Sequence, residues 1–366
     1  MKKNLHIAVS GLSRGENPQP GLGIIRSIRR NLPDAFVIGL AYDAMESGIY
    51  VEGGPNETHL MPFPAAGMEP FFERLDAIRN RTQLDIYIPT LDSEIDLLAH
   101  AKDEFAQRGI RVCLPDTVTL RRRAKQHLPA LAAACGARVP ETRIANDAHT
   151  AVLLGDELGY PLIVKGPYYD AKLAHSPAEL AAAVTRLLSE WGGPVILQRC
   201  AQGPEFNALG IGDGRGGLLG LCCIRKTLLS EKGKGQGGIT IDDPRLSGLC
   251  ARVVRTLKWP GPFELEVILD AETNDYVIIE MNPRFPAWVD FPSMIGANFP
   301  AALVTMLAGE EPAPLPACPA GRFYIRHQIE VAGRVEDFAT LFGDAPCAPA
   351  DAPAASKPVN RSRLIL

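Results

Sequence analysis

The chain has 366 residues, a formal net charge of −4 and a hydrophobic fraction of 46%, which is typical of a globular protein with two or three domains. The slight negative charge gives no indication of a nucleic-acid-binding protein, although it does not exclude a local basic groove. No apolar run reaches membrane-spanning length, and the N-terminus leads directly into a predicted strand instead of a signal peptide. We therefore expect a cytoplasmic protein with neither a membrane nor a nucleic acid as partner.

The 8 cysteines are scattered without a CxxC pair, and Cys222 and Cys223 are adjacent. This spacing favours neither a cysteine metal site nor a disulfide framework, so we expect most of them to be small core residues.

The first part of the chain alternates predicted strands with predicted helices. The strands cover residues 5–11, 35–42, 85–90 and 111–114, and this alternation predicts a parallel sheet with right-handed crossovers. Ligands bind at the carboxyl ends of such strands, which places them near residues 10–23 and 90–94.

Two glycines, Gly21 and Gly23, stand at the start of the first predicted helix. They lack the third glycine of a dinucleotide fingerprint, so a helix start is favoured over a nicotinamide site.

The middle of the chain begins with one predicted helix over residues 120–135, which is basic at its start and ends at Gly136. A later predicted strand, residues 162–165, ends in Lys165. A lysine in that place suits a phosphate site, but it also suits a side chain that reaches from a strand end to solvent. A helix capped by Ser176 follows and runs to about residue 190.

Further strands are predicted at residues 195–198, 206–211 and 218–224, with a hairpin turn at 212–217. Residues 230–238 combine glycines with lysines, which fits either a cationic loop that closes over phosphates or a plain surface loop.

A hairpin rich in acidic residues follows, with strands at 263–270 and 276–284. Because residues two apart share a strand face, Glu264 and Glu266 lie together, as do Glu280 and Asn282, while Val277, Ile279 and Met281 take the other face. Buried carboxylates need a cation, and oxygen ligands without His or Cys favour Mg²⁺ or Mn²⁺. The alternative is a polar face that meets water.

In their order and spacing, these pieces resemble the ATP-grasp superfamily of the carbamoyl-phosphate synthase and biotin carboxylase type. The most specific parts are residues 279–284, Ile-Glu-Met-Asn-Pro-Arg, and residues 197–205 with their Leu-Gln and Gly-Pro-Glu. The resemblance covers residues 116–308, and the first domain matches the sheet that precedes this fold in the family.

The resemblance implies roles for individual residues. Lys125 and Lys165 would hold the nucleotide phosphates and the adenine edge. The strand of Gln198, Arg199 and Cys200 would read adenine through backbone groups.

The remaining roles concern the ribose, the metal and the reaction. Glu205 would accept hydrogen bonds from the ribose. Glu266, Glu280 and Asn282 would carry the metal ions, and Arg284 would meet the transferred phosphoryl group. The family spacing favours Glu266 over Glu264 as a ligand.

One departure concerns the loop after the lysine strand, which is usually glycine-rich in the family. Here it is residues 166–172, Gly-Pro-Tyr-Tyr-Asp-Ala-Lys, so phosphate closure would depend on Lys172 or on residues 233–238. This loop argues against carbamoyl-phosphate synthase and biotin carboxylase themselves. So do the presence of a single nucleotide unit and the absence of a recognisable C-terminal biotin-site domain.

The expected fold is α/β with α+β nucleotide domains, in which an N-terminal parallel-sheet domain precedes a two-subdomain ATP-grasp fold. The expected domains are residues 1–115, a small lid at 116–194, a large subdomain with the metal site at 195–334, and an Ala/Pro-rich tail at 335–366. Similar proteins are usually dimers.

The expected activity is that of an ATP-dependent ligase, which activates a carboxylate as an acyl phosphate and joins it to an amine or another nucleophile. Its substrates would be a small carboxylic acid and an amine, amino acid or peptide, bound near residues 17–23 and 92–94. Metals, Lys165 and Arg284 would share positioning and charge neutralisation. Two alternatives stay open: a bicarbonate-dependent carboxylase that acts through carboxyphosphate, and a catalytically silent ATP-binding protein.

Overall fold

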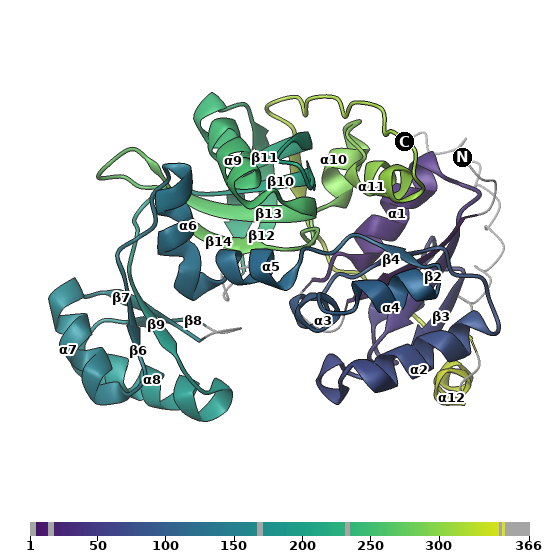
Figure 1. Ribbon diagram of the computed structural model, residues 1–366, viewed down its shortest axis with the longest axis horizontal. Coiled ribbons are helices and arrows are strands. Elements are labelled where there is room, and N and C mark those ends of the chain that lie inside the picture. Colours follow the sequence, from purple (N-terminus) through teal and green to yellow (C-terminus); the bar gives the residue numbers. More distant parts are fainter. Residues whose placement is uncertain (1–4, 14–17, 167–170, 231–234, 344–345, 348–366) are drawn as a thin grey trace, which may run out of the picture.

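Three β-sheets organise the protein, which we analysed as a computed structural model. The structure describes residues 5–13, 18–166, 171–230, 235–343 and 346–347. Figure 1 shows the three sheets in separate parts of the molecule, with the four-stranded sheet in a lobe of its own.

The first sheet is five-stranded and parallel, as the sequence predicts, with the strand order β3-β2-β1-β4-β5. Its strands are β1 (His6–Ser10), β2 (Phe36–Ala41), β3 (Glu57–Leu60), β4 (Ile86–Ile88) and β5 (Arg111–Val112). The helices of this part are α1 (Gly21–Asn31), α2 (Met68–Arg79), α3 (Asp92–Leu98) and α4 (Lys102–Gln107), with the 3₁₀ turns η1 (Ser47–Ile49) and η2 (Pro64–Ala66). The short edge strand β3 has no counterpart among the predicted strands.

The second sheet, which contains the acidic hairpin, is six-stranded and antiparallel, with the order β14-β13-β10-β11-β12-β15. Its strands are β10 (Glu205–Asp213), β11 (Leu218–Leu229), β12 (Gly235–Ile241), β13 (Pro260–Leu269), β14 (Tyr276–Asn282) and β15 (Phe323–Ile325). The helices that accompany it are α9 (Pro244–Leu257), α10 (Asp290–Met294) and α11 (Phe299–Leu307).

The third sheet is four-stranded and antiparallel, with the order β6-β9-β7-β8. It consists of β6 (Thr142–Ala145), β7 (Leu162–Lys165), β8 (Ala171–Ala174) and β9 (Val195–Arg199), with helices α7 (Ala148–Leu158) and α8 (Pro177–Trp191). This lobe has its own hydrophobic core, whereas the other two sheets share two cores between them. Among the described residues, the lobe therefore shares no hydrophobic core with the two larger sheets, whereas these sheets share cores with each other.

The predicted helix over residues 120–135 is wrong as a single helix. The structure has α5 (Thr117–Arg123), the turn η3 (Lys125–His127) and α6 (Leu128–Cys135) instead. Pro129 is the cause, because its ring would clash with the carbonyl of Lys125 in a continuous helix, whereas the first turn of a new helix accepts it. Lys125 consequently lies in a 3₁₀ turn between two helices.

The C-terminal part begins with helix α12 (Val335–Phe342), which packs near β3. Cys347 forms a backbone bridge with Thr58. The predicted Ala/Pro-rich tail otherwise lies outside the described residues. Among the described residues, no helix is long and apolar enough to cross a membrane.

The glycines at the start of α1 have packing roles. A Cβ on Gly21 would lie 2.3 Å from the carbonyl oxygen of Ser10 and 2.4 Å from that of Gly11. A Cβ on Gly23 would lie 3.0 Å from the side chain of Val289. These close approaches explain both glycines without a bound dinucleotide.

Gly21→Ala should therefore lower the free energy of unfolding by about 1–3 kcal/mol, since the backbone it meets cannot move aside cheaply. The matched control is Gly248→Ala inside α9, where the added methyl group meets only the end of Arg252, at 3.7 Å. That change should raise stability by about 0.5–1 kcal/mol. Urea unfolding of both variants provides the check, and equal effects would contradict the packing role of Gly21.

Candidate active site

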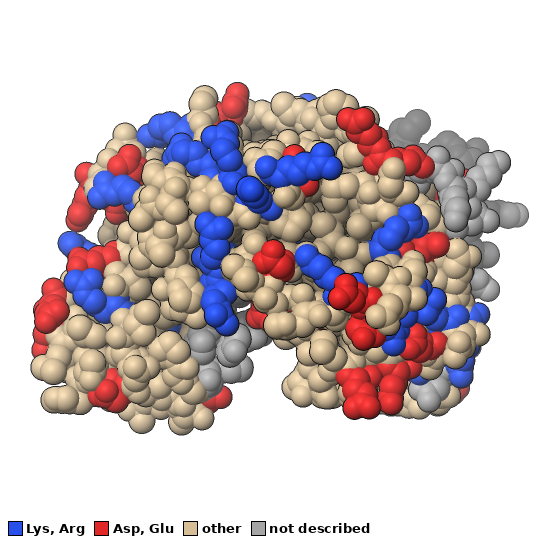
Figure 2. All heavy atoms as spheres, viewed as in Figure 1, with Lys and Arg blue, Asp and Glu red and all other residues tan. Residues whose placement is uncertain are grey.

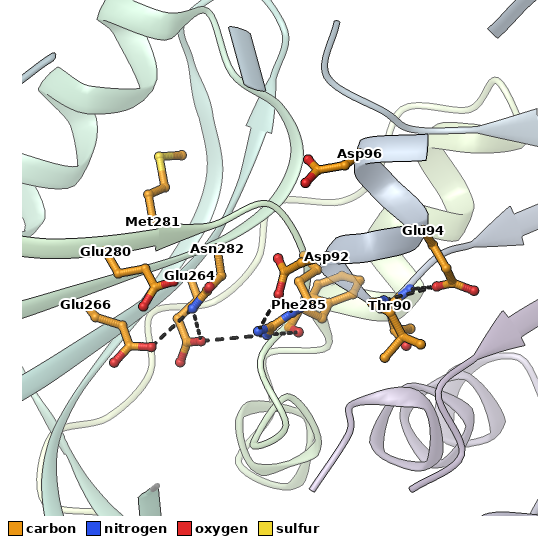
Figure 3. A network of polar contacts seen from close by, with 12 residues as sticks. Thr90, Asp92, Glu94, Asp96, Glu264, Glu266, Glu280, Met281, Asn282 and Phe285 are labelled. Atoms are coloured by element: carbon orange, nitrogen blue, oxygen red, sulfur yellow. Dashed lines mark hydrogen bonds and ion pairs between the residues drawn. The ribbon is translucent and has the colours of Figure 1, made fainter. Parts of the chain in front are cut away.

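The acidic hairpin forms as the sequence predicts, with its polar residues directly opposite one another. Glu264 pairs with Asn282, and Glu266 pairs with Glu280. Residues directly opposite on antiparallel strands share a face, so all four project from the same side of the sheet. Figure 3 shows them side by side.

The register between β13 and β14 shifts after Glu266, so part of the apolar face predicted from the sequence is wrong. Ile278 pairs with Val267 and is fully buried, whereas Ile279 is only half-buried. Because a bulge adds one residue to one strand, it moves the following side chains to the opposite face. The prediction that Ile279 packs in the core with Met281 is therefore wrong, and Ile278 takes that place.

Glu264 is the most buried of the three carboxylates in this set, with 5% of its surface exposed. Its Oε1 accepts hydrogen bonds from Trp288 Nε1 at 2.9 Å and from Asn207 Nδ2, and its Oε2 accepts one from Asn282 Nδ2 at 3.1 Å. Burial raises the pKa of Glu264, the nearby charge of Glu266 adds to this, and Arg284 opposes it.

Glu266 interacts with a lysine that the sequence analysis did not identify. Lys226 Nζ lies 2.9 Å from Glu266 Oε2 and 2.9 Å from Glu205 Oε2. Burial alone would lower the pKa of Lys226, but the two carboxylates outweigh it and raise the pKa. Strand register was the missing signal, because β10 pairs Phe206 with Arg225 and so brings Glu205 beside Lys226.

Glu280 faces the lysines predicted to bind phosphate. Lys125 Nζ, from η3, lies 3.4 Å from Glu280 Oε1. Lys165, at the end of β7, is buried and donates to Gln198 Oε1 at 2.9 Å. The pKa of Lys165 is lowered to about 8, mainly by burial; Lys125 acts in the same direction, whereas Glu280 and Glu266 oppose it. The small lobe thus presents Lys165 toward the hairpin.

Arg284 connects the hairpin with the first domain. Its Nε donates to Asp92 Oδ2 at 3.2 Å, and its Nη1 lies 4.0 Å from Glu264 Oε2. Burial would lower the pKa of Arg284, but Asp92 and Glu264 raise it above its ordinary value. Asp92 begins α3, and Figure 3 shows it approaching the hairpin from the other side of the site.

The predicted nucleotide residues are brought together only in part. Lys125, Lys165, Gln198 and Glu205 line the approach to the hairpin, but Lys172 and Arg199 are exposed and Cys200 is half-buried. The Arg199 amide already donates to the carbonyl of Glu141 at 2.9 Å, within the four-stranded sheet. Of the residues to which phosphate closure was assigned, Lys172 lies in β8 and residues 235–238 lie in β12 instead of a loop, while residues 233–234 lie outside the described residues.

The region predicted to bind the two substrates is also only partly supported. Asn17 lies outside the described residues. Glu94 is buried, and its carboxylate accepts hydrogen bonds from Ser10 at 2.6 Å, from Tyr87 at 2.8 Å and from Tyr42. These contacts give Glu94 a structural role that joins β1, β2 and β4, and they leave Asp92 as the acidic group of α3 that reaches the hairpin.

The oxygen atoms of the hairpin fit a magnesium ion that is shared with phosphates. Among the described residues, no group of three or more His, Cys, Asp and Glu side chains is arranged to hold a metal ion by itself. The set is two carboxylates, Glu266 and Glu280, and the amide of Asn282. Mg²⁺ is usually held by one or two carboxylates together with substrate phosphates, so the donor set suits it.

Between the small lobe and the first domain the surface is notched, below the six-stranded sheet (Figure 2). The hairpin site lies between these two parts, because Lys165 reaches it from one and Asp92 from the other. A ligand at the hairpin would therefore contact three parts of the chain.

No family model matches the chain, but solved structures share its fold. A biotin carboxylase from Campylobacter jejuni in a β-γ-ATP complex matches with a TM-score of 0.65 and 17% identity, over 85% of this chain and 72% of that one. An L-amino acid ligase from Bacillus licheniformis matches with a TM-score of 0.61 and 17% identity, over 84% and 75%.

A third match carries nucleotide, magnesium and bicarbonate. It is the biotin carboxylase domain dimer of the Hydrogenobacter thermophilus 2-oxoglutarate carboxylase, in complex with MgADP, ADP and bicarbonate, with a TM-score of 0.64 and 17% identity over 84% of this chain and 70% of that one. At such identities the likeness establishes the fold, and the roles of individual residues must be argued from this chain.

The burial of Lys165 can be tested through the pH dependence of the free energy of unfolding. Its pKa is lowered from 10.5 to about 8 in the folded chain, so the folded state binds fewer protons than the unfolded state between these values. The contribution of this group to the free energy of unfolding should therefore rise with pH across that window, by up to about 3 kcal/mol.

Urea unfolding at pH 7, 8, 9 and 10 should show this rise for the wild type relative to Lys165→Met. Lys102→Met, at an exposed position, is the control for loss of a lysine. Parallel curves for wild type and Lys165→Met would contradict the burial of a charged Lys165.

Proposed function

We propose that this chain, whose fold is the ATP-grasp fold of these neighbours, is an ATP-dependent ligase that activates a carboxylic acid as an acyl phosphate and transfers the acyl group to an amine. One observation carries the proposal. The carboxylates of the hairpin are each matched with a cationic side chain, and these cations come from three different parts of the chain.

This pairing has a chemical consequence. In the structure, Lys125 neutralises Glu280, Lys226 neutralises Glu266, and Arg284 lies beside Glu264. With a divalent ion held by these carboxylates, Lys125 and Lys226 would be available to contact phosphate oxygens. Such an exchange keeps every buried charge compensated.

Magnesium would be held by Glu266, Glu280 and Asn282, and it would supply charge neutralisation between the phosphate oxygens and these carboxylates. Lys165 and Lys125 would bind phosphate oxygens from the side of the small lobe. Their approach would also exclude water, which protects an acyl phosphate from hydrolysis.

The remaining nucleotide contacts follow the sequence expectations. The strand of Gln198, Arg199 and Cys200 would bind adenine. Glu205 would accept hydrogen bonds from the ribose, which requires it to share or release Lys226.

The reaction consists of two displacements. An oxygen of the substrate carboxylate attacks the γ-phosphorus of ATP, the bond to the β,γ-bridging oxygen breaks, and ADP leaves. The amine nitrogen then attacks the acyl carbon, inorganic phosphate leaves with the electron pair of the broken C–O bond, and the amine loses a proton. Arg284 would bind the transferred phosphoryl group, and positioning would supply most of the catalysis.

The substrates are proposed as a small carboxylic acid and an amine, an amino acid or a peptide, bound between the hairpin and Asp92. The acidic group of Asp92 and the guanidinium of Arg284 form the wall of the site on that side. Assembly as a homodimer and the division into an N-terminal domain, a lid and a large subdomain are parts of the same proposal.

The test is ADP release by the purified chain with ATP and Mg²⁺, across a panel of acids, each with and without a panel of amines. Release that depends on both an acid and an amine, with an amide detected by mass spectrometry, supports the ligase. Release that depends on bicarbonate alone would support a carboxylase instead. Tight Mg·ATP binding without any ADP release across the panels would support a silent nucleotide-binding protein.

Glu280→Gln should lower kcat for ADP release by about 10²–10³-fold, because loss of the carboxylate removes a ligand of the metal that neutralises the phosphates. The fold should persist, since the side chain is 30% exposed. Glu272→Gln, in the exposed loop of the same hairpin, should keep full activity. A fully active Glu280→Gln variant would remove the metal assignment.

A further inference from the structure

Glu264 has a role that none of the preceding assignments gives it. We propose that Glu264 is a positioning residue that fixes the side-chain amide of Asn282 with its oxygen toward the metal, without itself being a ligand. This inference rests on the proposed function, and it concerns a carboxylate that lies on the same strand face as the proposed ligands.

Every polar contact that the structure gives to Glu264 comes from a hydrogen-bond donor. Oε1 accepts from Trp288 Nε1 at 2.9 Å and from Asn207 Nδ2, and Oε2 accepts from Asn282 Nδ2 at 3.1 Å. The guanidinium of Arg284 lies 4.0 Å from Oε2. Only a carboxylate offers acceptors on both sides of such a pocket, because an amide would present a donor on one of them.

Exposure distinguishes Glu264 from the other two carboxylates on this face. Its side chain is 6% exposed, whereas those of Glu266 and Glu280 are 26% and 30% exposed. Both of its oxygens accept hydrogen bonds from neutral side chains, whereas Glu266 accepts from the charged Lys226 as well as from Asn282. Glu264 is therefore built into the sheet, while its two neighbours face the ligand.

The orientation of Asn282 follows from these contacts. Its Nδ2 donates to Glu264 Oε2 at 3.1 Å and to Glu266 Oε1 at 3.1 Å. Both amide hydrogens are used, so the planar amide must direct Oδ1 away from the two carboxylates. Only the oxygen of an amide can bind a cation, so the metal site depends on which way this amide is turned.

Glu264→Gln should turn the amide of Asn282 over. The indole N–H of Trp288 can only donate a hydrogen bond, so the side-chain oxygen of the new glutamine faces Trp288. The glutamine NH₂ group then faces Asn282 Nδ2, where two donors cannot bond. Rotation of the Asn282 amide restores a hydrogen bond, but it presents NH₂ to the metal.

The experiment is calorimetric titration of the full-length protein with ADP, with and without MgCl₂. In the wild type, Mg²⁺ should strengthen ADP binding. In Glu264→Gln, affinity in the presence of Mg²⁺ should fall by about 10–100-fold, as is usual when a group that orients a ligand is lost. Affinity without Mg²⁺ should stay within about twofold of the wild type.

A second substitution should rescue the first. Aspartate at position 282 has two equivalent oxygens, so its orientation no longer matters. In the double variant Glu264→Gln/Asn282→Asp, one of these oxygens accepts a hydrogen bond from the glutamine and the other binds the metal. Mg²⁺-dependent ADP affinity should recover by at least about tenfold over Glu264→Gln alone. In the otherwise unchanged chain, Asn282→Asp places a third carboxylate against Glu264 and Glu266, and it should lower the urea midpoint of unfolding.

The control is Glu46→Gln, another buried carboxylate whose contacts are amides of the first domain. It should lower stability without changing the effect of Mg²⁺ on ADP affinity. If Glu264→Gln keeps the wild-type response to Mg²⁺, loses affinity equally with and without Mg²⁺, or is not rescued by Asn282→Asp, the positioning role is overturned. A wild-type protein that binds ADP with no response to Mg²⁺ would overturn the proposed function, and this role with it.

Discussion

Compensation of buried negative charge is the constraint on which the site depends. Four oxygen-bearing side chains project from one face of a hairpin, and a buried carboxylate without a partner is costly. The chain meets this cost with Lys226 from the same sheet, Lys125 from the turn between α5 and α6, and Arg284 just after the hairpin. The elements around the hairpin are thereby fixed relative to it by charge as well as by apolar packing.

The same need for charge compensation explains why side chains from three parts of the chain meet at the hairpin. The two larger sheets share hydrophobic cores, so the hairpin and the first sheet are packed together, and Arg284 and Asp92 add an ion pair between them. The four-stranded lobe has a separate core and reaches the site through Lys165. Burial lowers the pKa of Lys165, because its ammonium group has lost most of its hydration and donates a hydrogen bond to Gln198.

The hairpin also shows that residues of one chemical type on one face can differ in role. Glu264 and Glu266 are two residues apart and project from the same side, but the side chain of Glu264 is 6% exposed and that of Glu266 is 26% exposed. Spacing along a strand cannot separate them, because the difference comes from Trp288 and Asn207, which other parts of the chain provide. Burial therefore separates Glu264 from the other two carboxylates of this face.

The sequence alone determined the parallel first sheet, the acidic hairpin with its polar face, and a fold like that of biotin carboxylase, which the match to a solved biotin carboxylase confirms. The strands and the hairpin are local features, because periodicity and turn residues specify them within short windows, whereas the resemblance rests on the order and spacing of motifs over residues 116–308. Tertiary structure decided the pairing of Lys226 with Glu205 and Glu266, the bulge that exchanges Ile278 for Ile279, and the ion pair between Arg284 and Asp92. These depend on register and on contacts between residues far apart in the chain, and no local pattern of residues encodes them.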